Sequence, residues 1–227
     1  KIIKKQIGDS KKNFKIIPHG ISERFRMKPF INREFTQSDR EAILKILYVS
    51  IIDVYKHQWH LIKALSQLRG KGFHLELHLV GPCNPSCKKL ILKYLDKYDP
   101  KREWVVVHGP ISYENLHYLY QSVDIGVYSS TCENLPNTLI EPMAAGLPIA
   151  CSKFSPMKEI VSKDSIFYDP ENPDDIELAL KKLIEDNMLR ESLSKINYER
   201  ALEYNWTQCA KKTFKYLKQI SDFYHLL

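Results

Sequence analysis

The chain has 227 residues, with 34 Lys and Arg against 27 Asp and Glu, so its formal charge is +7 at pH 7. Hydrophobic residues make up 44% and charged residues 27%, a balance typical of a soluble globule and not of a disordered chain. No apolar run reaches the roughly 18 residues of a membrane-spanning helix, and the first fifteen residues show no apolar signal core.

Short apolar runs rich in Val, Ile, Leu and Tyr predict six β-strands. They cover residues 44–50, 73–81, 104–109, 124–130, 147–152 and 165–169. Between them, apolar residues follow the 3.6-residue period of half-buried helices over 57–69, 86–99 and 112–122. After residue 170 the pattern is helical only, over 173–186, 188–204 and from 206 towards 220. This alternation predicts an α/β fold: a Rossmann-like, doubly wound parallel sheet with helices on both faces and a helical C-terminal tail.

The chain organisation follows from these patterns. Residues 1–40 are expected to form a basic N-terminal segment with an entry strand and loop, and residues 41–170 the Rossmann-like core. Residues 171–227 are expected to be helices that pack on the same domain. Six of the first fifteen residues are Lys, which suits an anionic membrane or polyanion but also fits a solvated terminus. No nucleic-acid-binding motif accompanies this charge.

The five cysteines are odd in number and irregularly spaced. Cys83 and Cys87 are four residues apart, but no second Cys or His pair stands at the distance of a zinc site. We expect reduced thiols in a cytoplasmic protein, and no metal site.

A dense polar cluster, Ser129 to Glu141, follows the strand predicted at 124–130 and precedes an Ala-rich helix that ends at Gly146. A helix that begins just after a strand offers free backbone N–H groups and the positive end of its dipole. Such a helix start is an anion site, and phosphate is its usual guest. Asn137 or a neighbour is expected to cap this helix.

Three charged residues stand near this expected anion site. Glu133 lies in the loop and Glu141 about one turn into the helix, so both carboxylates can reach the helix tip. Carboxylates suit hydroxyl groups, as on ribose or a sugar, whereas a phosphate needs a cation, for which Lys56 is the candidate. Spacing alone favours a simpler interpretation, in which Glu133 is a solvated loop acid, Glu141 a helix-start acid and Lys56 a surface lysine.

Several segments, in order, resemble the C-terminal domain of a GT-B type glycosyltransferase of the large retaining group-one family, family four. They include IIPHGIS at 16–22, ILYVS followed by Tyr55-Lys56, LHLVGP, VHGPIS and ENLPNTLIEPMAAGLPIACS. The resemblance extends to about residue 217 and implies one half of a GT-B fold.

The resemblance also implies donor binding: this domain holds a nucleotide-diphosphate sugar, linked to UDP or GDP, with no cofactor and no metal. Glu133 matches the first Glu of the E-x7-E motif, which contacts the transferred sugar, and Glu141 matches the second, which binds ribose hydroxyls. Lys56 matches the lysine that neutralises the diphosphate. Asn137 and Thr138 fall where backbone amides hold phosphate, and Ile111 falls near the position that packs against the base.

The implied reaction is transfer of a hexosyl or N-acetylhexosaminyl group, with retention, to a polysaccharide or glycolipid acceptor. In the family, an N-terminal Rossmann domain carries the acceptor site, and we expect this chain without it to bind donor and transfer nothing. The implied location is cytoplasmic, with peripheral association at the inner membrane face.

The chain departs from the family pattern at three places. Ser50-Ile51 stands where Gly-Arg is common, Pro136 has no N–H to offer a phosphate, and Pro142 lies inside the helix. These departures keep a non-catalytic nucleotide-binding or interaction module open as an alternative. A sugar-nucleotide epimerase of related fold is a further alternative, which the E-x7-E block disfavours.

Overall fold

The computed structural model describes residues 14–27 and 43–225. Its centre is a six-stranded sheet in which every described strand pair is parallel. The strands are β1 (Leu44–Val49), β2 (Leu75–Val80), β3 (Val105–Gly109), β4 (Ile125–Tyr128), β5 (Ile149–Ser152) and β6 (Ile166–Tyr168). All six strands predicted from the sequence are confirmed.

The helices follow the predicted alternation. The α-helices are α2 (Gln58–Gly70), α3 (Lys88–Tyr98), α4 (Leu116–Gln121), α5 (Asn137–Ala144), α6 (Met157–Ile160), α7 (Pro173–Glu185), α8 (Asn187–Ala201) and α9 (Trp206–His225). The described residues also form the short 3₁₀ helices η1 (Glu23–Phe25), η2 (Val54–Lys56) and η3 (Pro85–Cys87). Compared with the prediction, α4 is shorter and α9 longer, and the single-turn α6 was not foreseen.

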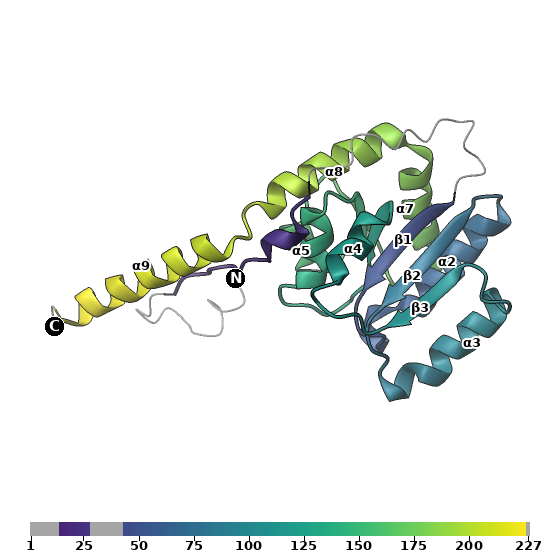
Figure 1. Cartoon of the computed structure of the whole chain (residues 1–227), viewed down its shortest axis with the longest axis horizontal. Coiled ribbons are helices and arrows are strands. Elements are labelled where there is room, and N and C mark those ends of the chain that lie inside the picture. Colours follow the sequence, from purple (N-terminus) through teal and green to yellow (C-terminus); the bar gives the residue numbers. More distant parts are fainter. Residues whose placement is uncertain (1–13, 28–42, 226–227) are drawn as a thin grey trace. The chain divides into compact units, whose positions relative to one another are not determined.

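The sheet order is β3-β2-β1-β4-β5-β6, so the chain winds outward from β1 to one edge and returns to continue on the other side of β1. Helix α2 packs against α3 and α7, and α5 packs against α8. Figure 1 shows β1, β2 and β3 side by side, with α3 running past the β3 edge. The expected doubly wound α/β fold is confirmed.

The order of the strands creates a switch point between β1 and β4. The chain leaves β1 in one direction along the sheet and leaves β4 in the other, so the loops after these two strands diverge. Ligands of open α/β sheets bind at such a crevice, at the carboxyl ends of the strands. The fold therefore predicts a ligand site formed by the segments after Val49 and after Tyr128.

The chain divides into two compact units. One is Ile21–Glu203, which holds the whole sheet; the other joins Lys1–Gly20 to Tyr204–Leu227, of which residues 14–20 and 204–225 are described. The expected division at residues 40 and 170 stays a prediction, and the N-terminal lysines up to Lys12 lie outside the described residues.

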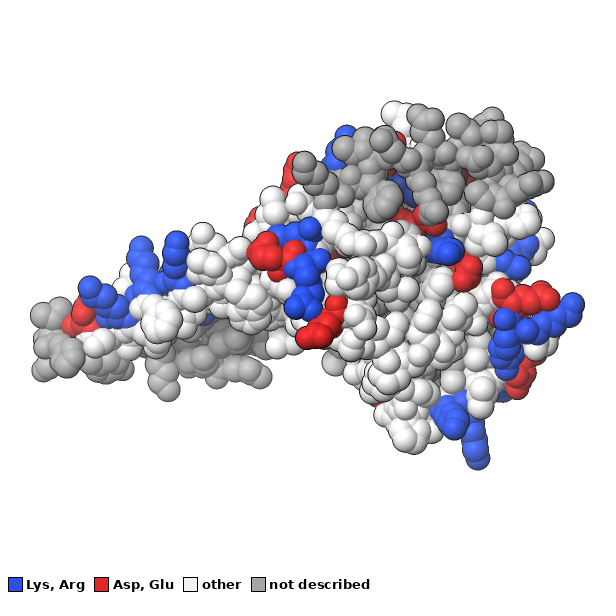
Figure 2. All heavy atoms as spheres, viewed as in Figure 1, with Lys and Arg blue, Asp and Glu red and all other residues white. Residues whose placement is uncertain are grey.

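Charged side chains gather in separate groups. On the face shown in Figure 2, basic and acidic side chains form a few mixed groups with a broad uncharged area between them, whereas basic side chains predominate among the charged ones over α9. This helix carries Lys211, Lys212, Lys215 and Lys218. In the part of the chain that the structure describes, no helix combines the length and the apolar character needed to cross a membrane.

Candidate functional site

The segments after β1 and β4 meet at the switch point. We call residues 50–57 the β1–α2 turn and residues 129–136 the β4–α5 loop. The backbone N–H of Thr131 in the loop donates to the carbonyl of Tyr55 in the turn, over 2.9 Å. Lys56 and Glu133, 77 residues apart in the sequence, thereby lie beside each other.

Lys56 is buried, with 5% of its surface exposed. Its ammonium donates to the hydroxyl of Tyr128 over 3.0 Å and forms an ion pair with Oε1 of Glu133. It also lies 5.1 Å from the ring centre of Tyr55 and 5.0 Å from that of Tyr128, within the range of cation–π attraction. Carboxylate, hydroxyl and ring faces together stabilise a charge that would otherwise be costly to bury.

The β1–α2 turn has its own local support. Asp53 is the N-cap of η2, since its Oδ1 accepts from the N–H of Val54 over 2.6 Å. Its other oxygen accepts from Nδ2 of Asn84, 3.0 Å away in the segment after β2. These bonds fix the conformation of the short 3₁₀ turn that ends in Lys56, and the turn thereby positions the lysine.

Tyr128, the last residue of β4, joins the lysine to the following helix. Its ring packs edge-on to Tyr48 of β1, with centroids 5.6 Å apart. Burial, then the Glu133 carboxylate, raise the pKa of Tyr128, while a hydrogen bond with the Thr138 side chain opposes the shift. The phenol is therefore neutral at physiological pH and links Lys56 to the first turn of α5.

Helix α5 begins at Asn137, with Pro136 in the N-cap position and no side-chain cap. The expectation that Asn137 or a neighbouring side chain caps this helix is wrong, because the neighbour in that position, proline, has no hydrogen-bonding side chain. The first intrahelical donors are the N–H groups of Leu139 and Ile140, both to the carbonyl of Pro136. The N–H groups of Asn137 and Thr138 precede them, as in any uncapped first turn, and suit an anion.

Glu141 lies on the buried side of α5, with 1% of its surface exposed. Its Oε2 accepts from the hydroxyl of Tyr120 in α4 over 3.0 Å. Burial raises the pKa of Glu141 to about 7, against the opposing effect of the Tyr120 hydrogen bond. A carboxylate at this depth is costly to ionise without further donors, and the two hydroxyls of a ribose are such donors.

The structure brings Lys56 and Glu133 into contact and places Asn137, Thr138 and Glu141 along the start of α5. Ile111 lies two residues after β3 and is half-buried. It shares the loop before α4 with Tyr113, whose pKa is raised by its own burial and then by Glu141. The roles of these residues stay predictions.

The sequence analysis gave no role in the site to Tyr55, Tyr128 or Thr131. Tyr128 lies in an apolar strand, and the local pattern therefore predicts a core residue. Nothing in that pattern indicates that its hydroxyl bonds to a lysine. Thr131 was inside the polar cluster, but its partner was not predictable before β4 was known to lie beside β1.

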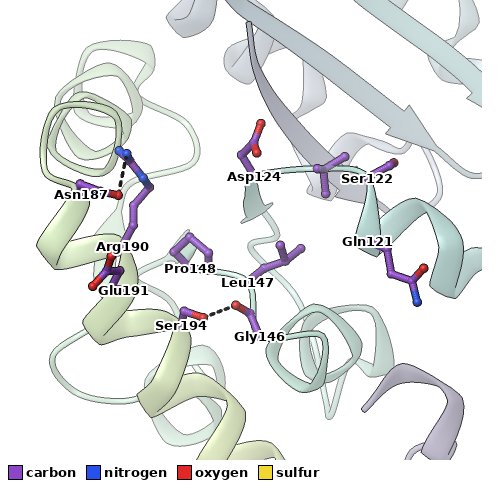
Figure 3. A pocket seen from close by; sticks show the side chains of 11 residues that line it. Gln121, Ser122, Asp124, Gly146, Leu147, Pro148, Asn187, Arg190, Glu191 and Ser194 are labelled. Carbon is purple, nitrogen blue, oxygen red and sulfur yellow. Dashed lines mark hydrogen bonds between the residues drawn. The ribbon is translucent and has the colours of Figure 1, made fainter. Parts of the chain in front are cut away.

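A partly open hollow of about 140 Å³ lies at the opposite edge of the sheet, before the starts of β4 and β5 (Figure 3). Two polar residues of its lining make structural contacts: Ser194 donates to the carbonyl of Gly146, and Arg190 donates to Asn187 over 3.2 Å and to the carbonyl of Ile184 over 2.7 Å. Arg190 thereby satisfies the last turn of α7.

Within residues 14–27 and 43–225, no three His, Cys, Asp or Glu side chains are arranged to hold a metal ion. The five cysteines are free, Cys87 and Cys151 being buried.

Comparison with known proteins decides the family. The family model described as "Glycosyl transferases group 1" matches residues 31–200, three quarters of the chain. The chain belongs to the group 1 glycosyl transferases. This agrees with the family resemblance of the sequence segments.

One curated relative and two solved structures are similar to this chain. The O-antigen chain mannosyltransferase B of Escherichia coli is 26% identical over 128 residues, 56% of this chain and 34% of that protein. Sucrose-phosphate synthase of Thermosynechococcus elongatus has a TM-score of 0.79 and 21% identity, covering 97% of this chain and 56% of its own. Anabaena HepE, solved in complex with UDP and glucose, has a TM-score of 0.75 and 17% identity, covering 90% and 57%. The chain thus spans from about a third to somewhat more than half of the length of these proteins.

Proposed function

We propose that the Ile21–Glu203 unit binds the diphosphate of a nucleotide sugar at the carboxyl edge of the sheet, between β1 and β4. The observation that carries the proposal is Lys56, a buried ammonium at the switch point. Among the described residues its Nζ has two partners, Tyr128 and Glu133, and an ammonium has three N–H donors. One N–H therefore remains for a phosphate oxygen.

The other predicted residues complete the proposed donor site. The N–H groups of Asn137 and Thr138 contribute the positive end of α5. Glu141 accepts from ribose hydroxyls, Glu133 contacts the transferred sugar, and Ile111 packs against the base. The complex of HepE with UDP and glucose supports a nucleotide diphosphate as ligand of this fold.

The proposed reaction is retaining transfer of a hexosyl or N-acetylhexosaminyl group from a UDP- or GDP-sugar, without a cofactor or metal. Negative charge grows on the leaving diphosphate as the glycosidic bond breaks. Lys56 and the start of α5 are preorganised to stabilise that charge, which is the usual largest contribution to such catalysis. The proposed acceptor is a polysaccharide or glycolipid, in keeping with the name of the E. coli mannosyltransferase. A separate N-terminal domain is proposed to bind it.

The test is calorimetric titration of the chain with UDP, GDP and ADP, each with and without Mg²⁺. Lys56→Met removes the charge but keeps the side-chain length, and Glu141→Gln keeps an acceptor for Tyr120. Exposed Lys93 and Glu185 offer matched controls, Lys93→Met and Glu185→Gln. We expect saturable, Mg²⁺-independent binding of one nucleotide, weakened about tenfold or more by each site variant and by neither control. Binding that survives both site variants would reject the proposed site.

A non-catalytic nucleotide-binding module remains the second candidate. Pro136 favours it, since a proline at the N-cap removes one N–H from the helix start, and so does the pairing of Glu133 with Lys56. Glu133→Gln in the whole protein separates the two: an enzyme loses turnover, whereas a binding module keeps its biological role.

We also propose a cytoplasmic location with peripheral association at an anionic membrane face. The lysines of α9 and of the N-terminal segment support it. Sedimentation with vesicles containing anionic phosphatidylserine is expected to weaken when the N-terminal lysines are changed to Gln. Unchanged sedimentation would count against a role for these lysines.

A further inference from the structure

His57 has an unusual backbone conformation next to the candidate phosphate lysine. Its φ is 52° and ψ 30°, and it is one of two non-glycine residues with positive φ in the described part of the chain, with Arg102. A side chain in this left-handed region is strained, and such strain persists only where the surroundings impose it. His57 is the residue that joins η2, ending in Lys56, directly to α2.

The ring of His57 is held by the loop that carries Glu133. Nε2 lies 3.2 Å from Oγ1 of Thr131, and the side chain belongs to a residue that is only 6% exposed. Oγ1 of Thr131 also makes a long contact of 3.4 Å with the carbonyl of Tyr55, which can only accept. The hydroxyl therefore donates to Tyr55 and accepts from Nε2–H of His57.

This assignment leaves the imidazole neutral. Nδ1 is buried and has no partner within the described residues, so a second ring proton would have no acceptor. Burial, followed by the neighbouring charge of His60, lowers the pKa of His57, while Glu171 and Asp169 oppose the shift. The geometry and the charge environment agree on a neutral ring that donates from Nε2.

We propose that His57 is a positioning residue for Lys56, whose hydrogen bond to Thr131 holds the β1–α2 turn against the β4–α5 loop. The two residues that flank Lys56, Tyr55 and His57, both bond to Thr131, which stands two residues before Glu133. The carbonyl of Tyr55 and the ring of His57, on either side of Lys56, are therefore hydrogen-bonded to Thr131. These bonds keep the ammonium of Lys56 beside Glu133 and Tyr128. The role in ligand binding rests on the proposed function; the positioning of Lys56 does not.

A packing role would depend on the ring alone, because His57 also stacks on His60 with centroids 5.4 Å apart and lies 6.0 Å from the ring centre of Trp59. Two variants separate the readings. His57→Phe keeps an aromatic ring but has no donor, whereas His57→Gln loses the ring but keeps an N–H donor near the position of Nε2. Thr131→Val removes the other end of the same bond at nearly constant shape.

The first readout needs no ligand: the rate at which acetic anhydride labels Lys56, measured by mass spectrometry relative to exposed Lys93 in the same sample. Opening of the turn exposes Lys56, so we expect labelling to rise about threefold or more in His57→Phe and Thr131→Val. The double variant should show no further rise over Thr131→Val alone, since that change already removes the bond to His57 together with the contact between Oγ1 and the carbonyl of Tyr55. His57→Gln should label as the parent does.

The second readout is the dissociation constant for UDP, GDP or ADP, whichever binds the parent chain. We expect His57→Phe and Thr131→Val to weaken binding about fivefold and His57→Gln to restore it, because a displaced Lys56 no longer meets the phosphate. The positioning role would be overturned if Lys56 in His57→Phe were labelled at the same rate as in the parent chain. It would also be overturned if His57→Gln raised the labelling rate as much as His57→Phe does. If the parent binds no nucleotide, the proposed function fails, and labelling alone still decides the role of His57.

Discussion

At the scale of single residues, the candidate site depends on burying charge. Lys56 and Glu133 have side chains only 7% and 13% exposed, and each is the other's counter-charge. A buried pair of this kind adds little stability over apolar residues of the same size, but removing one partner leaves the other charge uncompensated. The pair therefore defines the site more than it stabilises the fold.

Lys56→Met is expected to lower the free energy of unfolding by about 3 kcal/mol, because Glu133 then stays buried without a cation. Adding Glu133→Gln should recover more than half of that loss. Urea denaturation at pH 7 measures both. The exposed pair Lys181 and Glu185, 3.6 Å apart, is the control, and Lys181→Met should cost less than about 0.5 kcal/mol. If the losses in free energy of unfolding of the two single variants simply add in the double variant, Lys56 and Glu133 do not stabilise each other.

Glu141 predicts a pH dependence of stability. Its pKa is about 7 in the folded chain against 4.5 for an ordinary glutamate, so between these values the folded chain keeps a proton that the unfolded chain has lost. The free energy of unfolding should therefore fall as pH rises from about 4.5 to 7, by about 3 kcal/mol in total from this residue. It should level off above that range.

Urea denaturation at pH 5, 6, 7 and 8 tests this prediction. The difference between the parent and Glu141→Gln should shrink or change sign as pH rises, because glutamine does not titrate. Glu185→Gln, at an exposed position, should follow the parent at every pH. Parallel curves for the parent and Glu141→Gln would contradict the raised pKa.

At the scale of elements, the ends of β1 and β2 are held in close approach by a glycine. Gly81, directly after β2, has φ of 137°, and a Cβ built there would lie 2.2 Å from the carbonyl oxygen of Ser50. The N–H of Ser50 donates to Val80 over 2.8 Å, and that of Gly81 to Gly109 over 2.9 Å. A side chain at Gly81 would thus displace the start of the β1–α2 turn.

Gly81→Ala is expected to destabilise the chain by more than about 3 kcal/mol, since it adds a backbone clash to the strain of its φ. Gly72, with φ of 92° and nothing within 4 Å of its Cβ position, isolates the strain. Gly72→Ala should cost only about 1 kcal/mol. Chemical denaturation measures the loss in free energy of unfolding for both variants. Equal losses would show that the close approach of Gly81 to Ser50 adds nothing to the cost of the backbone strain.

At the scale of the whole molecule, all six strands and every candidate site residue belong to the Ile21–Glu203 unit. A chain limited to residues 21–203 is therefore expected to fold cooperatively, because its core is internal to the unit. Its nucleotide dissociation constant should stay within about threefold of that of the full chain. Circular dichroism and calorimetric titration measure these outcomes, and an unfolded or non-binding product would show that the unit is incomplete.

The fold was largely predictable, since β-branched apolar runs and helical periodicity mark strands and helices locally. The errors lie where local pattern says little. Helix α6 is a single turn, too short to show a period, and the cap of α5 depends on which residue starts the helix. The site was predicted in part: charge reasoning indicated Lys56, Glu133 and Glu141, but not that the first two pair.

The sequence by itself determined the alternation of strands and helices, the residues that follow each strand, and membership of the group 1 family. The tertiary structure alone decided which strand ends are neighbours. That β4 lies beside β1 depends on how crossovers and side-chain packing order the sheet, and no local pattern encodes that order. The pairing of β4 with β1 brings Lys56 to Glu133 and His57 to Thr131.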